Sequence, residues 1–366
     1  MENVTTHYSA EMALLMLTEG HGFTIPLLKQ TMADSGQGLK ISFSNIRFED
    51  IAHLVGLDHL RMIKDMETFP LRRSRIDTGL FKSIVEDIDA MMLQYGSPTE
   101  HENEEARSRF LSPIFNRISI VFEGVFRNKP EGMIPGRIAS QGRIEYYFKI
   151  FGVITTIFIE FMKKIGDTGT DRLDAIAQVI AECDACDWVN TQNGFSVPIY
   201  AILCDGDRFE FYQFTSQDPR PHKFSRGVYS PDRLSRTALH RLRLPDLSDS
   251  NNALSFMTAL RPVCEVIFDL FLQGYCSAVE AQHDRSAPTP GTDEQRHKNL
   301  EAWRDSYAHA VRAKDKLERL TSRVQWGRSV KQSRMLEGNR NSGNEISSSI
   351  FGRLICKAEY EFEREW

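Results

Sequence analysis

Apolar side chains recur at helical spacing through the first 95 residues of the chain. The segments AEMALLML, FEDIAHLV and FKSIVEDIDAMML each place them at positions i, i+3 and i+4, which predicts amphipathic helices. The next segment, GSPTEHENEE, combines Gly96, Ser97 and Pro98 with a run of acidic residues, a composition typical of a linker. We therefore expect a helical N-terminal region over residues 1–95 that ends at a domain boundary.

The pattern changes repeatedly between residues 104 and 215. A helix over EEARSRFLSPIFNRISIVFEGVF, interrupted near Pro113, precedes two segments rich in β-branched and aromatic residues, RIEYYFKIF and VITTIFIEF. Gly152 separates these two segments, which predicts a hairpin. Helical spacing returns in RLDAIAQVIAECDACDWVN, and VPIYAILCDGDRFEFYQF predicts two more strands around the turn-forming pair Asp205-Gly206. The expected order is helix, strand, strand, helix, strand, strand.

From residue 217 to residue 250 the chain is rich in proline, arginine and serine and has little periodicity. The stretch from Leu254 to Cys276 is strongly apolar, but every fourth position carries a polar residue, and these residues form one stripe: Arg261, Glu265, Asp269 and Gln273. This spacing predicts an amphipathic helix that packs on the core, and it argues against a membrane span. We expect the αβ core over residues 96–280, and a linker with a helical, basic C-terminal region over residues 281–366.

Composition narrows the class of protein. A chain of 366 residues that is 41% hydrophobic and 26% charged can bury a sizeable core. Its net charge of -5 at pH 7 gives no global reason to expect nucleic acid as a partner, so any basic surface must be local. The six cysteines are sparse, and the N-terminus has no basic segment before its apolar run. We therefore expect an intracellular protein, nuclear or cytoplasmic, that is not secreted.

Several common site motifs are absent from the sequence. Cys183 and Cys186 form a C-x-x-C pair, but no second pair of cysteine or histidine residues follows at the spacing of a zinc ribbon. We expect both side chains to pack in the core. The sequence also has no H-E-x-x-H motif, no Walker A glycine loop and no H-R-D or D-F-G string, so metalloprotease, P-loop and kinase functions lack support.

Acidic and amide residues fall on the expected elements in a definite order. They are Glu105 in the first helix, Glu145 in GRIEYYF, Glu160 in FIEFMKK, Gln178 in AIAQVIAEC and the hairpin YAILCDGDRFEFY. This order resembles the PD-(D/E)XK, or restriction-endonuclease-like, nuclease superfamily, especially its intracellular members in fungi and other eukaryotes. The resemblance runs from about Glu104 to Phe214. It implies an α+β fold with a mixed central sheet flanked by helices, and helical extensions at both ends.

The resemblance also implies a metal-dependent nuclease site. Glu145 matches the acid on the family's second strand, and Glu160 matches the first residue of the E-x-K motif on the third strand. These two carboxylates would hold Mg²⁺ or Mn²⁺ at the scissile phosphodiester, because the reaction builds negative charge on the phosphoryl oxygens. Glu105 and Gln178 match two further site residues of the family.

One position departs from the family pattern. Side chains alternate between the two faces of a strand, so the lysine of E-x-K lies on the same face as its glutamate. Met162 occupies that position here. A bulge would turn Lys163 into the site, or Lys164 would reach back along its flexible stem; the sequence leaves both routes open.

Two segments carry local basic charge. Between Gln217 and Leu244, two aspartates face seven basic residues, which are Arg220, Lys223, Arg226, Arg233, Arg236, Arg241 and Arg243. Between Val311 and Arg334, two acidic residues face eight basic ones. Such side chains supply the phosphate contacts of nucleic-acid-binding proteins. The plain alternative is a solvated surface, or a face that pairs with acidic segments.

Three functions stay open on these observations. The first is hydrolysis of phosphodiester bonds with Mg²⁺ or Mn²⁺ by a protein that acts on nucleic acid, DNA in preference to RNA. The second is a pseudonuclease that keeps the fold and binds nucleic acid or protein without cleavage, and Met162 is its best evidence. The third is an assembly protein that forms homo-oligomers through its helical segments. None of the three involves a membrane.

Overall fold

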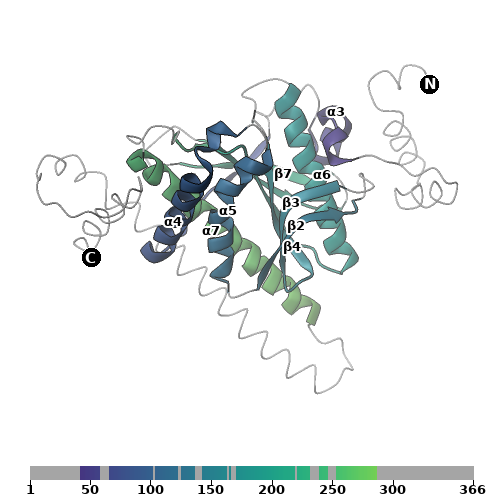
Figure 1. Cartoon of the computed structure of the whole chain (residues 1–366). Coiled ribbons are helices and arrows are strands. Elements are labelled where there is room, and N and C mark those ends of the chain that lie inside the picture. Colours follow the sequence, from purple (N-terminus) through teal and green to yellow (C-terminus); the bar gives the residue numbers. More distant parts are fainter. Residues whose placement is uncertain are drawn as a thin grey trace, which may run out of the picture.

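The computed structural model describes residues 42–57, 66–101, 104–122, 125–136, 142–162, 165, 170–218, 221–230, 239–245 and 253–286. Within these residues the chain is an α+β protein in which one mixed sheet of eight strands lies between helices (Figure 1). The strands are β1 (Glu67–Pro70), β2 (Phe126–Ile134), β3 (Gly142–Ile150), β4 (Ile154–Phe161), β5 (Ile199–Cys204), β6 (Arg208–Thr215), β7 (Lys223–Val228) and β8 (Leu242–Arg243). The helices are α3 (Phe48–Ile51), α4 (Thr78–Tyr95), α5 (Glu104–Ile120), α6 (Thr170–Gln192) and α7 (Ala253–Ser286), with the short 3₁₀ helices η1 (Phe43–Asn45), η2 (Ala52–Val55) and η4 (Pro98–Glu100).

The strand order places two fully buried strands inside the sheet. The order is β1-β7-β6-β5-β4-β3-β2, and β8 pairs with β6 beside this path. Every residue of β4 and of β5 is buried, as expected for strands that helices cover on both faces. These two strands run parallel, and α6 forms the crossover between them. β1 is parallel to β7, and the other pairs are antiparallel.

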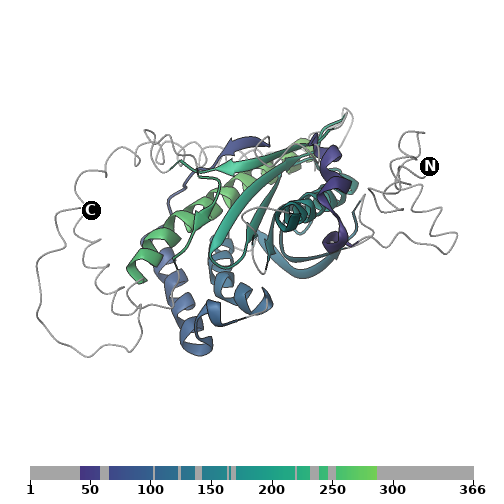
Figure 2. The same ribbon diagram turned by 90° about the horizontal axis from the view of Figure 1, so that it is seen from above.

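Helices cover both faces of the sheet. α6, with α3 beside it, lies on one face, whereas α5 and α7 lie on the other, where α4 packs against α5 (Figure 2). Aromatic side chains fill the second of these layers. The Phe271 ring on α7 contacts the rings of Phe126 and Phe148, and the Phe115 ring on α5 contacts that of Phe161. The core therefore consists of two apolar layers with the sheet between them.

The hairpin predicted around Gly152 is confirmed. β3 and β4 pair antiparallel, and φ is positive at two successive residues of the turn, 52° at Phe151 and 76° at Gly152. Val153 N donates to Ile150 O at 3.1 Å and closes the turn. Positive φ at both central residues is typical of the type I′ turn, whose twist matches that of the flanking strands. The hairpin of β5 and β6 also forms as predicted, with φ of 104° at Gly206.

Four strands, β1, β2, β7 and β8, were not predicted from the sequence pattern. α5 ends at Ile120, before the end of the predicted helix, and β2 begins at Phe126, the last residue of that predicted helix. The strand contains Asn128, Pro130 and Gly132, so it lacks a clean alternation of polar and apolar residues. It lies at the edge of the sheet, where a residue without an N–H is tolerated because one side of the strand has no partner. β7 and β8 come from the arginine-rich stretch that looked irregular.

Helix α5 corrects a second expectation, because it continues through Pro113, where a break was predicted. Proline has no N–H to donate to the carbonyl four residues earlier, which here belongs to Arg109. The Ser112 hydroxyl donates to Arg109 O at 2.8 Å. The acceptor therefore keeps a partner, which removes one of the penalties of proline inside a helix.

Elements on both sides of the boundary predicted near residue 96 pack together. α4, which confirms the helix expected over FKSIVEDIDAMML, begins at the cap residue Asp77 and contacts α5. The segment FEDIAHLV forms only α3 and η2. AEMALLML and residues 287–366 lie outside the described residues, and the boundary itself stays a prediction.

The polar stripe of α7 points toward the segment that follows β1. Glu265 and Asp269 are only 5% and 8% exposed. Arg73 Nε donates to Glu265 Oε2 at 2.7 Å, and Ser74 Oγ donates to Asp269 Oδ1 at 2.6 Å. The predicted amphipathic helix is confirmed, but its polar face binds another part of the chain. None of the helices in the described part of the chain has the length and apolarity needed to cross a membrane.

Candidate functional site

Two carboxylates from neighbouring strands occupy the face of the sheet that α6 covers. In the antiparallel pair of β3 and β4, Tyr146 is opposite Ile159, so the next position places Glu145 opposite Glu160. Residues directly opposite each other have Cβ atoms about 4.5–5.5 Å apart and point to the same face. Glu160 is 6% exposed. Glu145 and Glu160 therefore form a cross-strand pair of acids at the end of a buried strand.

Helix α6 adds an amide and a third carboxyl group to this pair. Gln178 Nε2 donates to Glu160 Oε1 at 2.6 Å and to Glu182 Oε1 at 2.9 Å. Gln178 and Glu182 are four residues apart, so they are neighbours on the same side of the helix. One amide group thus bridges β4 and α6. We call Glu145, Glu160, Gln178 and Glu182 the acidic cluster.

Glu182 is fully buried, and its environment favours the neutral form. Burial raises the pKa of Glu182 to about 8, and the charge of Glu145 acts in the same direction, while hydrogen bonds with Gln178 and Glu160 act against it. Desolvation raises the pKa of a carboxyl group because it penalises the charged form. Glu182 therefore keeps its proton at pH 7 and adds no negative charge to the cluster.

The strand remains regular at the position where the family's lysine would lie. β4 and β5 keep a continuous register through Phe161, and Met162 N extends the ladder by donating to Cys204 O at 2.9 Å. No residue is inserted between Glu160 and Met162, so the two side chains lie on the same face. Directly after β4, Met162 therefore occupies the position that corresponds to the lysine of E-x-K.

The structure brings together three of the residues singled out in the sequence, Glu145, Glu160 and Gln178. Lys163, Lys164 and the side chain of Glu105 lie outside the described residues, so their roles stay predictions. Sequence reasoning missed Glu182. Its signal is a glutamate one helical turn after Gln178, within a segment whose neighbours are apolar.

The donor set of the acidic cluster suits a hard cation. Among the described residues, no group of three or more His, Cys, Asp or Glu side chains is arranged to hold a metal ion. Mg²⁺ does not need such a cage, because it is bound through one or two carboxylates and completes its shell with water and substrate oxygens. The pair Glu145 and Glu160 therefore fits Mg²⁺ or Mn²⁺, and it does not fit a structural zinc site.

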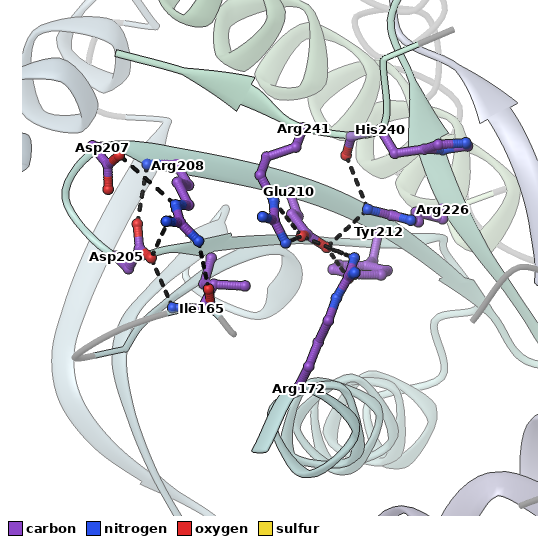
Figure 3. A network of polar contacts seen from close by, with 10 residues as sticks. All are labelled: Ile165, Arg172, Asp205, Asp207, Arg208, Glu210, Tyr212, Arg226, His240 and Arg241. Atoms are coloured by element: carbon purple, nitrogen blue, oxygen red, sulfur yellow. Dashed lines mark hydrogen bonds and ion pairs between the residues drawn. The ribbon is translucent and has the colours of Figure 1, made fainter. Parts of the chain in front are cut away.

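The turn after β5 holds the chain that follows Met162. Asp205 Oδ2 accepts from Ile165 N at 2.7 Å, and Arg208 Nη1 donates to Ile165 O at 2.8 Å (Figure 3). Burial raises the pKa of Asp205 to about 6, and the neighbouring Asp207 acts in the same direction. The Asp-Gly motif of the late hairpin thus anchors the backbone just beyond Lys163 and Lys164.

A second buried glutamate lies on the same face of the sheet. Leu203 is opposite Glu160 on β4 and opposite Glu210 on β6, so both glutamates point toward the α6 face. Adjacent strands are 4.7–4.9 Å apart, which places the two positions about 10 Å from each other. Glu210 is fully buried.

Three arginines contact the Glu210 carboxylate (Figure 3). Arg172 Nη2, from α6, lies 3.1 and 3.2 Å from its two oxygens. Arg241 Nε, from the residue before β8, donates to Oε1 at 2.8 Å, and Arg226 Nη2, from β7, lies 3.3 Å from Oε2. Tyr212 also donates to Oε2, at 2.6 Å. Burial alone would raise the pKa of Glu210, but Arg226 and the other partners lower it overall. We call Arg172, Arg226 and Arg241 the arginine cluster.

The remaining basic candidates divide into two groups. Lys223 Nζ lies 3.0 Å from Glu67 Oε2, and Arg243 Nε lies 3.3 Å from Asp207 Oδ2, both at exposed positions. Arg220, Arg233 and Arg236 lie outside the described residues, as does the basic segment from Val311 to Arg334. Arg172 was missed because it precedes the basic run by more than 40 residues and joins it only in the folded chain.

The C-x-x-C pair lies inside α6. Cys183 and Cys186 are both fully buried and free. Burial raises the pKa of each thiol well above its usual value, so neither is a ready nucleophile or metal ligand. The expectation that both side chains pack in the core is confirmed.

Comparisons with known proteins find little similarity. No family model and no curated protein matches the chain. Seven chains of known structure match it, among them a chain of the DrdV–DNA complex determined by electron cryomicroscopy. That chain is 13% identical, with a TM-score of 0.26, and the match covers 57% of this chain and 16% of that one. This protein thus spans only a small part of the length of that structure.

Proposed function

We propose that this chain is a PD-(D/E)XK-like protein that acts on nucleic acid, DNA in preference to RNA, and hydrolyses phosphodiester bonds with Mg²⁺ or Mn²⁺. The observation that carries the proposal is the cross-strand pair of Glu145 and Glu160, to which Gln178 is bonded from the crossover helix. Carboxylates at such a position can hold a cation beside a phosphate group.

The order of elements supports the proposal. The resemblance places its first acid on the second strand of the core and its E-x-K motif on the third. Because β2 precedes them, Glu145 lies on the second strand after α5 and Glu160 on the third. α6 then carries Gln178, and β5 and β6 form the late hairpin.

Glu145 and Glu160 are the residues that would hold the cation. When bound, it would stabilise charge on the phosphoryl oxygens and lower the pKa of a water molecule. The chain's own residues position the site. Gln178 restrains the Glu160 carboxylate through a bond of 2.6 Å, and the neutral Glu182 limits the repulsion between the acids.

A cleavage assay with matched variants tests this function. Plasmid DNA and an RNA oligonucleotide are incubated with Mg²⁺ or Mn²⁺ and with the parent, Glu160→Gln or Glu86→Gln. Glu86 is a fair control because its side chain is 52% exposed on α4 and pairs only weakly with Lys82, at 4.0 Å. We expect the parent and the control to cleave DNA, and Glu160→Gln to be slower by more than about 100-fold.

Metal binding gives a readout that does not depend on cleavage. Mn²⁺ should raise the melting temperature of the parent and of Glu86→Gln, because a ligand that binds only the folded state stabilises it. It should have no such effect on Glu160→Gln. Equal shifts in all three proteins would contradict a site at Glu160.

Met162 favours a second candidate function, a pseudonuclease that binds nucleic acid without cleaving it. The residue takes the place of the family's lysine, and the regular ladder up to Met162 leaves no room for a bulge before it. Folded parent protein that binds DNA, but shows no cleavage with either metal, would support this second function over the first.

A further inference from the structure

The arginine cluster brings together side chains from three separate parts of the chain. Arg172 lies on α6, Arg226 on β7 and Arg241 just before β8, and all three contact the carboxylate of Glu210. Their side chains are 13%, 11% and 20% exposed, in that order. The guanidinium groups are thus recessed, yet solvent still reaches part of each side chain.

Neutralising and hydrogen-bonding the Glu210 carboxylate does not require three arginines. One arginine can satisfy both oxygens of a carboxylate in a bidentate pair, and a carboxylate has about four acceptor sites in total. Glu210 already accepts a hydrogen bond from Tyr212, and all three arginines contact its carboxylate. Three guanidinium groups thus face a single carboxylate, which leaves an excess of two positive charges in the cluster.

Arg226 Nε is buried and has no hydrogen-bond partner among the described residues. The same guanidinium group lies close to the backbone just before Arg241, because Arg226 Nη2 is 3.5 Å from His240 O (Figure 3). A buried donor is unfavourable without a partner, so an acceptor that reaches Arg226 Nε would gain a hydrogen bond that the described residues do not supply.

The local electrostatic field favours an anion. Burial lowers the pKa of His240, and the charges of Arg226 and Arg172 lower it further, against an opposing effect of Glu210. Burial also lowers the pKa of Arg226; the charge of Glu210 opposes this effect, whereas the charges of Arg172 and Arg241 add to it. The three arginines therefore repel one another, and Glu210 is the negative charge that holds them together.

We propose that Arg172, Arg226 and Arg241 form a binding site for a phosphate group of a nucleic-acid strand, and that Glu210 holds the three guanidinium groups in position. Arginine presents its donors in a planar fork that matches phosphate oxygens. Glu160 and Glu210 share one face of the sheet about 10 Å apart, so one strand of nucleic acid can reach both. The identity of the ligand as nucleic acid rests on the proposed function, whereas the anion site itself does not.

The test measures binding without cleavage, with the full chain in EDTA. Fluorescence anisotropy follows a short labelled single-stranded DNA that carries either a 5′-phosphate or a 5′-hydroxyl. The double variant Arg172→Gln/Arg241→Gln is compared with Lys82→Gln/Arg117→Gln, which removes the same charge at positions 36% and 41% exposed on α4 and α5. We expect the cluster variant to bind about 100-fold more weakly, or about tenfold for each lost charged contact. The control should lose less than about threefold.

The two DNA ends distinguish the source of the phosphate. A preference for the 5′-phosphate that the cluster variant loses would show that the site takes a terminal phosphate. Equal affinity for both DNAs, lost in the cluster variant, would show that it takes a backbone phosphate. Equal affinities of the cluster variant and the control would overturn the site.

Glu210→Gln should strengthen phosphate binding, whereas the arginine variants should weaken it. This change removes the carboxylate and leaves three arginines that repel one another, so inorganic phosphate should raise the melting temperature of Glu210→Gln more than that of the parent. Equal shifts would mean that the arginines serve only Glu210. If the double variant does not fold, Arg172→Gln alone replaces it, with Arg117→Gln as its control, because two arginines then still contact Glu210.

The outcomes separate this site from the proposed hydrolysis. Weak binding by the cluster variant, with no cleavage by the parent in Mg²⁺, would support the phosphate site and contradict the nuclease. Cleavage by the parent, with equal binding by the cluster variant and its control, would support the nuclease and contradict the phosphate site. Stabilisation by inorganic phosphate with unchanged DNA binding would contradict a nucleic-acid ligand.

Discussion

The Glu160 carboxylate on β4 accepts a hydrogen bond of 2.6 Å from Gln178 Nε2 on α6. The same amide nitrogen donates to Glu182, one turn further along the helix. This bridge fixes the position of the crossover helix over the end of its strand. It also determines how the acidic cluster responds to mutation and to pH.

The first prediction concerns Gln178. Gln178→Met keeps the size of the side chain and removes both hydrogen bonds that the amide donates to the two buried carboxyl groups. We expect the free energy of unfolding to fall by about 2–4 kcal/mol, measured by urea denaturation at pH 7. Gln213→Met is the matched control, because Gln213 Nε2 only reaches Tyr200 OH at 3.4 Å, and it should change stability by less than about 1 kcal/mol. Similar losses in both variants would contradict a special role for the bridge.

The second prediction concerns the pH dependence of stability. The pKa of Glu182 is raised to about 8 in the folded protein, whereas an ordinary glutamate titrates near 4.3 in the unfolded chain. Between these two pH values the folded state binds more protons than the unfolded state, so the free energy of unfolding falls as pH rises. The slope from this group reaches at most about 1.4 kcal/mol per pH unit, and it decreases as the pH falls through the unfolded pKa or rises through the folded one.

Glu182→Gln removes this group from the titration while keeping its shape. Urea denaturation between pH 5 and pH 8, in EDTA, should show a shallower fall of stability with pH in the variant than in the parent. Parallel curves for the two proteins would show that Glu182 titrates normally in the folded state.

The third prediction concerns the inward polar stripe of α7. Ser74→Ala removes the hydrogen bond of 2.6 Å to Asp269, which is 8% exposed. We expect a loss of about 1.5–3 kcal/mol in the free energy of unfolding, because the acceptor is a buried carboxylate. Ser119→Ala, which removes an exposed bond to Asn116 O, should change stability by less than about 0.5 kcal/mol. If Ser74→Ala is as mild as this control, the stripe does not hold the segment after β1.

The fourth prediction concerns the pairing of β1 with β7. Gly227 is opposite Phe69 in this pair, and a Cβ atom at Gly227 would lie 2.7 Å from Leu71 Cδ2. We expect Gly227→Ala to lower stability by about 1–3 kcal/mol, because the clash forces Leu71 or the edge strand to move.

A double-mutant cycle checks the origin of that loss. Leu71→Ala creates space beside Gly227, so the double variant should be more stable than the sum of the two single losses predicts, by at least about 0.5 kcal/mol. Additive losses would mean that β1 does not pack against β7 in this way.

Local patterns were enough to predict the centre of the fold. Alternating and continuous apolar runs identified β3, β4, β5 and β6, and the two hairpins followed from Gly152 and Asp205-Gly206. Helical spacing identified α4, α6 and α7. These elements were predictable because their periodicity and turn residues are contained within a few consecutive positions. Gln178 and the two strand acids were found for the same reason, since each lies on such an element.

The strands β1, β2 and β7 were not predictable in this way. β1 and β7 are short, and β2 contains Asn128, Pro130 and Gly132, so the alternation typical of a strand is not visible in their sequences. β1 forms through hydrogen bonds to β7, which is distant in the chain, as in the pairing of Glu67 with Ser225. β2 forms through its pairing with β3, which follows it. Tertiary context thus outweighs local propensity in these strands.

The sequence by itself determined the central elements, because they are carried by local pattern, and the order of its motifs singled out Glu145, Glu160 and Gln178. Only the tertiary structure decided that the polar stripe of α7 faces inward, and that Glu182 loses its charge on burial. Only the tertiary structure also brought Arg172 to Arg226 and Arg241 around Glu210. The physical reason is that burial, register and charge pairing depend on which surfaces meet, and those surfaces come from segments far apart in the chain.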